Sequence, residues 1–261
     1  MTIKDLEALV ARVSQALNSA RIPCVLWGHC LLRVHGVPSV VGSIDFVIPD
    51  DLLQAGAGAL DHAANQLKIL ALCPNSGGCS VIGSDRHTPP PALHSHLDDS
   101  EVTVGLYLQR DTLWFLPPLS SMSTSLLSPT TTEQLPQYFL LASDREALPP
   151  WRPGRGPGFF KSEQSGVVVP RTHVLLEAFM RLYARDVGTR IGSFAMAMIA
   201  YMEEYVDDDG FLDVDQLPEV LKKVYLALRQ GRMESVSQWS KDLQQALKIS
   251  DGSEDHGGGH S

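Results

Sequence analysis

The sequence lacks any long uninterrupted apolar stretch. Its most extended weakly polar run, residues 191–202, is too short to cross a bilayer, which takes about 20 residues. A secretory signal peptide is not expected either, because the N-terminal segment carries the charged residues Lys4, Asp5, Glu7 and Arg12. We therefore expect a cytoplasmic protein that does not bind membranes.

Cysteine and positive charge are both scarce. Four cysteines in 261 residues, Cys24, Cys30, Cys73 and Cys79, are too few for a disulfide scaffold, so reduced thiols are expected. A net charge of -9 argues against broad affinity for DNA or for anionic membranes. A phosphate-bearing partner would therefore have to be bound at a specific site.

The chain has an ordinary globular composition, 44% apolar and 20% charged, and is long enough to bury a large core. Alternating strand and helix patterns come first and purely helical patterns follow, which predicts an α/β lobe and then a helical lobe. The predicted parts are an α/β lobe over 1–116, a Pro/Gly/Ser-rich connector over 117–170, a helical lobe over 171–249 and a disordered tail over 250–261.

Hydrophobic periodicity gives the order of elements in the first lobe. Apolar spacing predicts a helix over 3–19, and short apolar runs predict strands at 22–27, 43–49 and 101–108. Gly28 ends the first strand, and a short helix follows that closes at Gly36. We expect another helix over 51–67 and a loop over 73–100. In the second lobe, helices are predicted at 171–187, 191–206, 215–230 and 234–248.

The order helix, strand, "GHC", helix, "GVP" and then "SIDFVIPDD" resembles the nucleotidyltransferase-like fold shared with DNA polymerase beta. More narrowly, "VHGVPSVVGSIDFVIPDD", together with "HSHL", "LWFLP" and "EEYVDDDG", resembles a family of fungal proteins with a degenerate version of that fold. The resemblance implies a nucleotidyltransferase-like mixed sheet with helices, followed by a C-terminal helical lobe.

The resemblance also implies a site. Active members of that superfamily bind phosphate at a glycine turn, where Gly28 and His29 stand, and hold magnesium with paired aspartates on the next strand, where Ser43 and Asp45 stand. A third acid could come only from Glu101 at the start of a later strand. One aspartate and a serine make a poor two-metal site, so Mg2+ is a weakened candidate cofactor and no metal ligands are assigned.

Asp45 and His29 each have a second interpretation. Asp45 can be a buried structural carboxylate that accepts backbone N–H bonds or pairs with Arg33, because an unpaired buried acid is costly. His29 can donate to an anion at the start of the short helix, or can be an ordinary half-exposed histidine.

The connector contains a small basic and aromatic stretch, "WRPGRGPGFFK". Arginine beside glycine and aromatic residues suits phosphate binding or base stacking, so Arg152, Arg155 and Lys161 are candidate substrate-binding residues. The alternative is a packed connector whose arginines pair with neighbouring acids.

Two further patterns resemble metal sites without matching them. Cys73, Cys79, His94 and His96 have metal-binding side chains, but their spacing differs from a familiar zinc knuckle. Residues 205–216 imitate a calcium loop, but tyrosine and glutamine occupy its first and last ligand positions. We expect a solvated acidic turn at 205–216 and no metal at either place.

The sequence leads to three hypotheses for the function. The leading hypothesis is a transferase that acts on a nucleotide or tRNA-linked substrate, with Gly28, His29, Ser43 and Asp45 as the floor of the site. A second is a tRNA-dependent synthase of arginine-containing cyclodipeptides in fungal secondary metabolism, in which aminoacyl-tRNA is the partner and Asp45 would pair with a guanidinium. A third is a non-catalytic nucleotide-binding pseudoenzyme.

Overall fold

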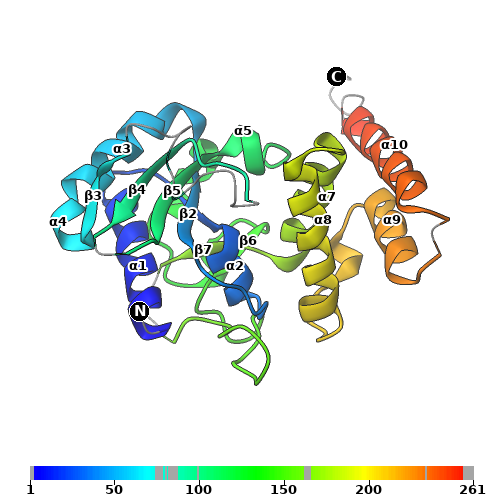
Figure 1. The fold of residues 1–261 in the computed structure, drawn as a ribbon, viewed down its shortest axis with the longest axis horizontal. Coiled ribbons are helices and arrows are strands. Elements are labelled where there is room, and N and C mark those ends of the chain that lie inside the picture. Colours follow the sequence, from blue (N-terminus) through cyan, green and yellow to red (C-terminus); the bar gives the residue numbers. More distant parts are fainter. Residues whose placement is uncertain are drawn as a thin grey trace. The chain divides into compact units, whose positions relative to one another are not determined.

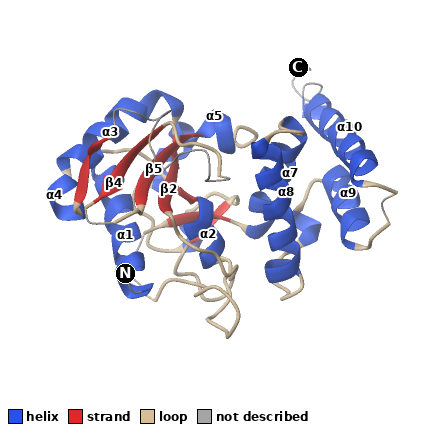
Figure 2. Cartoon of the chain, in the orientation of Figure 1, coloured by secondary structure: helices blue, strands red, loops and turns tan. Residues whose placement is uncertain are grey.

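The computed structural model describes residues 3–73, 79, 81, 88–98, 100–161, 166–232 and 234–254. The chain divides into two compact units, residues 1–171 and 172–261. The first unit holds every strand of the described residues, and the described part of the second is helical (Figures 1 and 2). The expected fold class, an α/β lobe followed by a helical lobe, is confirmed.

The first unit is built on a mixed five-stranded sheet with the order β1-β2-β5-β4-β3. The central pair, β2 and β5, is parallel, and the other three pairs are antiparallel. Figure 1 shows β3, β4, β5 and β2 side by side. The strands are β1 (Val25–Trp27), β2 (Ser43–Ile48), β3 (Ile69–Leu72), β4 (Leu93–Leu97) and β5 (Thr103–Leu108).

One face of this sheet is covered by helices. The amphipathic helix α1 (Ile3–Ser19) buries Val10, Val13 and Leu17, as its apolar spacing requires. Gly56 in α3 lies against side chains of β2 and β5, where the Cδ1 of Leu106 is only 3.0 Å from the position of an added Cβ. The covering helices are α1, α3 (Leu53–His62) and α4 (Ala64–Leu67), and a 3-10 turn, η1 (Asp50–Leu52), precedes α3.

Two strands appear where the sequence analysis predicted a loop or nothing. β4 lies within the expected loop 73–100, and β3 follows the helix that was expected to run to residue 67. The segment of β4, "LHSHL", places two histidines and a serine between two leucines, so its short alternation was hidden by polar residues. Pairing with β5 fixes it as a strand.

Residues of the expected connector, 117–170, lie within the first unit instead of linking two lobes. They form short elements and a two-stranded antiparallel sheet, in which Phe139, Leu140 and Leu141 are buried. This burial explains why the segment packs despite its proline and glycine content. Its elements are α5 (Gln109–Thr112) just before it, then η2 (Leu119–Met122), α6 (Ser123–Leu126), η3 (Thr132–Gln134), β6 (Phe139–Leu141) and β7 (Val168–Pro170).

The second unit begins with α7 (Thr172–Arg185) and α8 (Arg190–Met202), which pack on each other. The later helices join this core through Trp239 and Tyr183, whose hydroxyl bonds to Ser240 at 2.6 Å. The remaining elements are a π-helical turn η4 (Glu203–Asp207), η5 (Val214–Gln216), α9 (Glu219–Arg229) and α10 (Val236–Glu254). α10 runs into the predicted tail, and 255–261 lie outside the described residues.

The acidic turn at 205–216 uses one of its carboxylates structurally. Asp207 is buried, accepts a hydrogen bond from the Tyr225 hydroxyl at 2.8 Å and pairs with Arg229 at 3.1 Å. Only part of this turn is therefore solvated as expected. Among the described residues, no helix is both long enough and apolar enough to cross a membrane.

A buried histidine ties the short helix α2 (Gly28–Val34) to β7. His35 follows α2 directly, is fully buried and bonds through Nε2 to the Pro170 carbonyl at 3.0 Å. A carbonyl only accepts, so Nε2 carries a proton. Burial lowers the pKa of His35 from 6.5 to about 4, although the bond to Pro170 acts in the opposite direction.

We expect His35 to make the protein less stable in acid. Between pH 6.5 and about 4 the unfolded chain binds a proton that the folded chain does not, so the free energy of unfolding falls as the pH drops through this window. The loss should reach at most about 3 kcal/mol. In His35→Gln the amide can still donate to Pro170, and urea titrations at pH 7 and 4.5 should show a smaller loss than in the wild type. The exposed His62→Gln is the control, and an equal loss in all three proteins would contradict this assignment.

Candidate functional site

The face of the sheet opposite α1 and α3 carries polar side chains. Along β2, Ile44, Phe46 and Ile48 point toward the helices, so Ser43 and Asp45 point to the other face. Asp45 is only 3% exposed although it is a carboxylate in the centre of the sheet. The candidate site is built around this buried acid.

Two glycines leave the space that the Asp45 carboxylate occupies. Gly105 is its partner on β5, and a Cβ there would collide with Asp45 Oδ1. Gly28 opens α2 on the other side, and a Cβ there would lie 2.6 Å from Oδ2. Gly28 also has φ +67, a conformation that favours glycine. Neither position can gain a side chain while Asp45 keeps its place.

Ser43 is a hydrogen-bond partner of this acid. Its hydroxyl donates to Asp45 Oδ2 at 2.6 Å, and Ser43 itself is partly exposed. The two residues are two positions apart on one strand, so their side chains share a face. Ser43 therefore lies between the buried carboxylate and the accessible end of β2.

The charges of Asp45 and Arg33 also affect the pKa of the Cys30 thiol in α2. Burial, and then the negative charge of Asp45, raise the pKa of Cys30 far above its usual range, while Arg33 acts in the opposite direction. Cys30 therefore stays protonated and is not a nucleophile. Arg33 is held by the Ser39 carbonyl at 2.9 Å, and Ser39 also bonds through its hydroxyl to His29 Nδ1. His29 thus lies on the loop side of α2, partly buried.

The remaining predicted acid lies at the same end of the sheet. Ser43 pairs with Thr103 on the parallel strand β5, and Glu101 precedes Thr103 by two residues in an exposed bend. Its role as a second acid remains a prediction.

The predicted basic residues lie on a turn that docks on α2. The backbone N–H of Gly156 donates to the Gly36 carbonyl at 2.7 Å, and that of Gly158 donates to the Arg33 carbonyl at 3.2 Å. Arg152 and Arg155 bracket this turn, and a bond of 3.1 Å from Arg155 N–H to the Arg152 carbonyl closes it. The turn therefore meets the C-terminal end of α2, whereas Asp45 lies against its N-terminal end.

Lys161 is exposed, and its backbone N–H donates to Glu7 Oε2 at 3.1 Å. Glu7 on α1 is itself buried. The end of the basic stretch is therefore fastened to the first helix through its backbone, which leaves the Lys161 side chain at the surface.

The structure brings together the cysteine and histidine side chains for which the spacing predicted no metal site. One ligand atom from each of Cys73, Cys79, His94 and His96 lies within 4.8 Å of the other three. The signal that could have found them is the pattern His-Ser-His, because residues two apart on a strand share a face. Because the sequence pattern predicts a loop over 73–100, it does not place the two histidines on one face of a strand.

No protein-family model and no curated protein matches the chain. Among solved structures, the chain is similar to the antibiotic-resistance factor ANT(2'')-Ia, at 9% identity and a TM-score of 0.37, over 98% of this chain and 97% of that one. At that score the likeness supports no argument about activity. The candidate site therefore has to be argued from its own residues.

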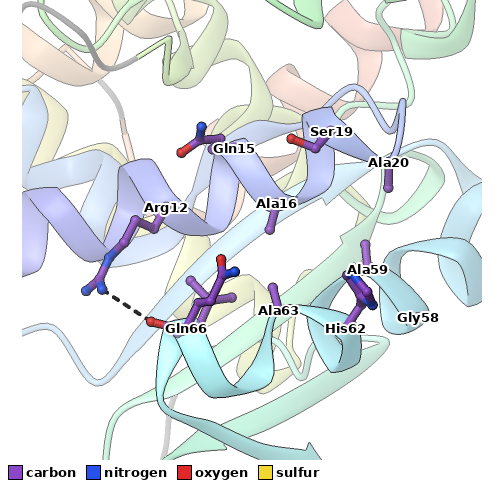
Figure 3. A pocket seen from close by; sticks show the side chains of 11 residues that line it. Arg12, Gln15, Ala16, Ser19, Ala20, Gly58, Ala59, His62, Ala63 and Gln66 are labelled. Atoms are coloured by element: carbon purple, nitrogen blue, oxygen red, sulfur yellow. Dashed lines mark hydrogen bonds between the residues drawn. The ribbon is translucent and has the colours of Figure 1, made fainter.

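A separate pocket of about 680 Å³ lies between α1 and the helices α3 and α4 (Figure 3). It is lined largely by small side chains such as Ala16, Ala59 and Ala63, and Arg12 crosses it to the Gln66 carbonyl at 3.3 Å. These helices cover the face of the sheet opposite Asp45. Because its lining residues include no carboxylate or thiol, we do not assign the chemistry to this pocket.

The contact between Gly105 and Asp45 predicts a strong coupling between the two positions. Gly105→Ala should lower the free energy of unfolding by about 1–3 kcal/mol, because its methyl group overlaps the carboxylate. In an Asp45→Ala background the same change should cost at least about 1 kcal/mol less. Urea unfolding of the four proteins measures this difference.

Gly58→Ala is the matched control for this cycle. Its Cβ would meet nothing within 4 Å on the exposed face of α3, so it should be neutral or stabilise by up to about 1 kcal/mol. Additive effects of Gly105→Ala and Asp45→Ala would show that the two residues do not compete for the same space.

Proposed function

We propose that this chain is a transferase on a nucleotidyltransferase-like core, and that it acts on a phosphate-bearing substrate, either a nucleotide or a tRNA-linked group. The observation that carries the proposal is the buried Asp45 carboxylate, held between Gly28 and Gly105 and bonded to Ser43. The substrate would enter from the partly exposed Ser43 end of β2.

A carboxylate at this position is costly to the fold. Burying an ionised acid costs free energy that hydrogen bonds and ion pairs have to offset, and an apolar residue in the same place would avoid the cost. Two positions around it, Gly105 in β5 and Gly28 at the start of α2, also lack side chains and so make room for it. A buried acid for which two glycines leave space is an informative departure from ordinary packing, which supports a chemical role for Asp45.

The donor set does not fit a two-metal mechanism. Two Mg2+ ions need several carboxylates at one point, whereas β2 supplies Asp45 and a serine whose proton is already directed at Asp45. The chemistry therefore falls on Asp45 and Ser43 themselves, with Glu101 as a candidate second acid.

In this scheme Asp45 accepts a proton. The attacking hydroxyl or amine of the acceptor loses its proton to Asp45, directly or through the Ser43 hydroxyl, as it forms a bond to phosphorus or to an acyl carbon. The bond to the leaving group breaks, and that group departs with the bonding pair. Proton transfer of this kind typically contributes about 10²- to 10⁴-fold to a rate.

The docked turn would supply the positive charge. Arg152, Arg155 and Lys161 lie in a stretch whose backbone is fixed to α2 and to Glu7, so their positions are set before any ligand binds. Arginine forks match phosphate oxygens in geometry, and this makes the turn the proposed clamp for the anion. His29 is the proposed donor from the α2 side.

We expect Asp45→Asn to fold but to lose function. Each nucleoside triphosphate with Mg2+, and separately a pool of charged tRNA, is tested by thermal shift and by retention on the immobilised protein. The wild type should respond to one of them, and Asp45→Asn should lose at least about tenfold in affinity or all turnover.

Asp61→Asn, an exposed acid on α3, is the matched control and should behave as the wild type. Turnover of a bound nucleotide assigns nucleotidyl transfer, and turnover of one retained tRNA species assigns the cyclodipeptide alternative. Binding without turnover assigns the pseudoenzyme. An equal response of Asp45→Asn and the wild type would remove Asp45 from the site.

The arginine clamp is tested by the double variant Arg152→Ala with Arg155→Ala. Affinity for the phosphate ligand should fall by about tenfold or more, because charge-assisted hydrogen bonds are lost, while the melting temperature barely changes. Arg110→Ala, an exposed arginine on α5, is the control. Unchanged affinity in the double variant would assign the arginines to packing of the turn.

A further inference from the structure

The four cysteine and histidine side chains lie at the edge of the sheet where β3 and β4 pair. Cys73 follows β3 directly, and its backbone N–H donates to the His94 carbonyl at 3.0 Å. His94 and His96 are two residues apart on β4, so both rings leave the same face of the strand. Cys79 lies between the two strands in the sequence, and its thiol lies close to the other three side chains.

The distances between the four ligand atoms suit the binding of one metal ion. Each ligand atom lies within 4.8 Å of the others, and Cys79 Sγ lies 3.4 Å from His96 Nε2. In a tetrahedral zinc site with Zn–S near 2.3 Å and Zn–N near 2.0–2.1 Å, neighbouring ligand atoms are about 3.3–3.8 Å apart. The observed arrangement therefore needs only small movements of side chains to reach that geometry.

The kind of ligand selects the metal. Two thiols and two imidazoles favour Zn2+ over Mg2+ or Ca2+, which prefer oxygen. The other cysteines differ in environment, because burial raises the pKa of Cys24 to about 12 and keeps it a thiol. Cys73 and Cys79 are only partly buried, so their thiols are open to deprotonation by a metal.

We propose that Cys73, Cys79, His94 and His96 bind one zinc ion in a closed, structural Cys2His2 site that fastens Cys73, at the end of β3, and Cys79 to β4. With four protein ligands the ion has no open position for a substrate. The bound ion stabilises an edge strand that is four residues long and has an irregular register with β4.

The site lies on the same face as Asp45 but apart from it. Trp27, Asp45, Gly105 and His94 form one row across β1, β2, β5 and β4. Two strand spacings of about 4.8 Å place the backbone of His94 roughly 10 Å from that of Asp45. The zinc proposal is independent of the proposed transferase activity, and each can fail without the other.

The first test is metal content. Protein purified under reducing conditions without chelator should contain about one zinc per chain by inductively coupled plasma mass spectrometry, and Cys73→Ser with Cys79→Ser should contain almost none. Cys24→Ala and His62→Asn keep four ligands and should retain the zinc. Cys24 lies next to β1 at the opposite edge of the sheet, and His62 is exposed on α3.

Two measurements on the wild-type chain keep the proposal testable if the serine variant does not fold. Replacement of zinc by Co2+ should give the visible absorption of a tetrahedral site with a thiolate charge-transfer band. Removal of zinc by a chelator should lower the melting temperature by about 5 °C or more, reversed by added Zn2+.

Two outcomes would overturn the proposal. One is reduced, folded protein that holds no zinc, gives no cobalt spectrum and melts at the same temperature with and without chelator. The other is an intact mass lower by two hydrogens under non-reducing conditions, with zinc absent after reduction, which would assign the close approach of Cys73 and Cys79 to a disulfide.

Discussion

The contact of one buried carboxylate with two glycines sets the geometry of the first unit's polar face. Asp45 fills the volume that side chains at Gly28 and Gly105 would otherwise take. As a result, the turn into α2 and the centre of β5 both depend on the same acid. The bond from Ser43 satisfies one of its oxygens, and the position of β2 between β1 and β5 fixes its backbone.

This constraint organises the rest of that face. The row from Trp27 to His94 runs through Asp45 and Gly105, and the next row joins Ser43, Thr103 and His96. Apolar residues fill the other face, under α1 and α3. The sheet therefore separates an apolar face under α1 and α3 from a face with buried polar groups, where the proposed transfer site on β2 and the proposed zinc site on β4 lie on either side of β5.

Much of this arrangement could be predicted from sequence. Regular apolar spacing gave α1 and the four later helices to within a few residues, and Gly28 and Gly36 bounded α2 because both need positive φ. β4 could not be predicted, since three polar residues break its apolar pattern and only pairing with β5 makes it a strand. The cluster of Cys73 with His94 depends on that pairing, so it was missed as well.

The packing of the segment 117–170 is a second feature that the sequence does not predict. Proline and glycine content predicts breaks in helices and strands, but it does not say whether the segment packs. Here Gly156 allows the backbone to approach within hydrogen-bonding distance of Gly36, where any side chain would meet the Val37 carbonyl. A segment with the composition of a linker therefore packs closely against α2 and the turn that follows it.

The short, irregular β3 also affects how readily another chain could add a strand to this edge of the sheet. An exposed sheet edge is a template on which another chain can add a strand, and long regular edges invite aggregation. β3 offers only four residues and breaks register against β4, so it presents few hydrogen-bonding groups in phase with an incoming strand. Such an edge is a poorer template for an added strand than a long, regular one.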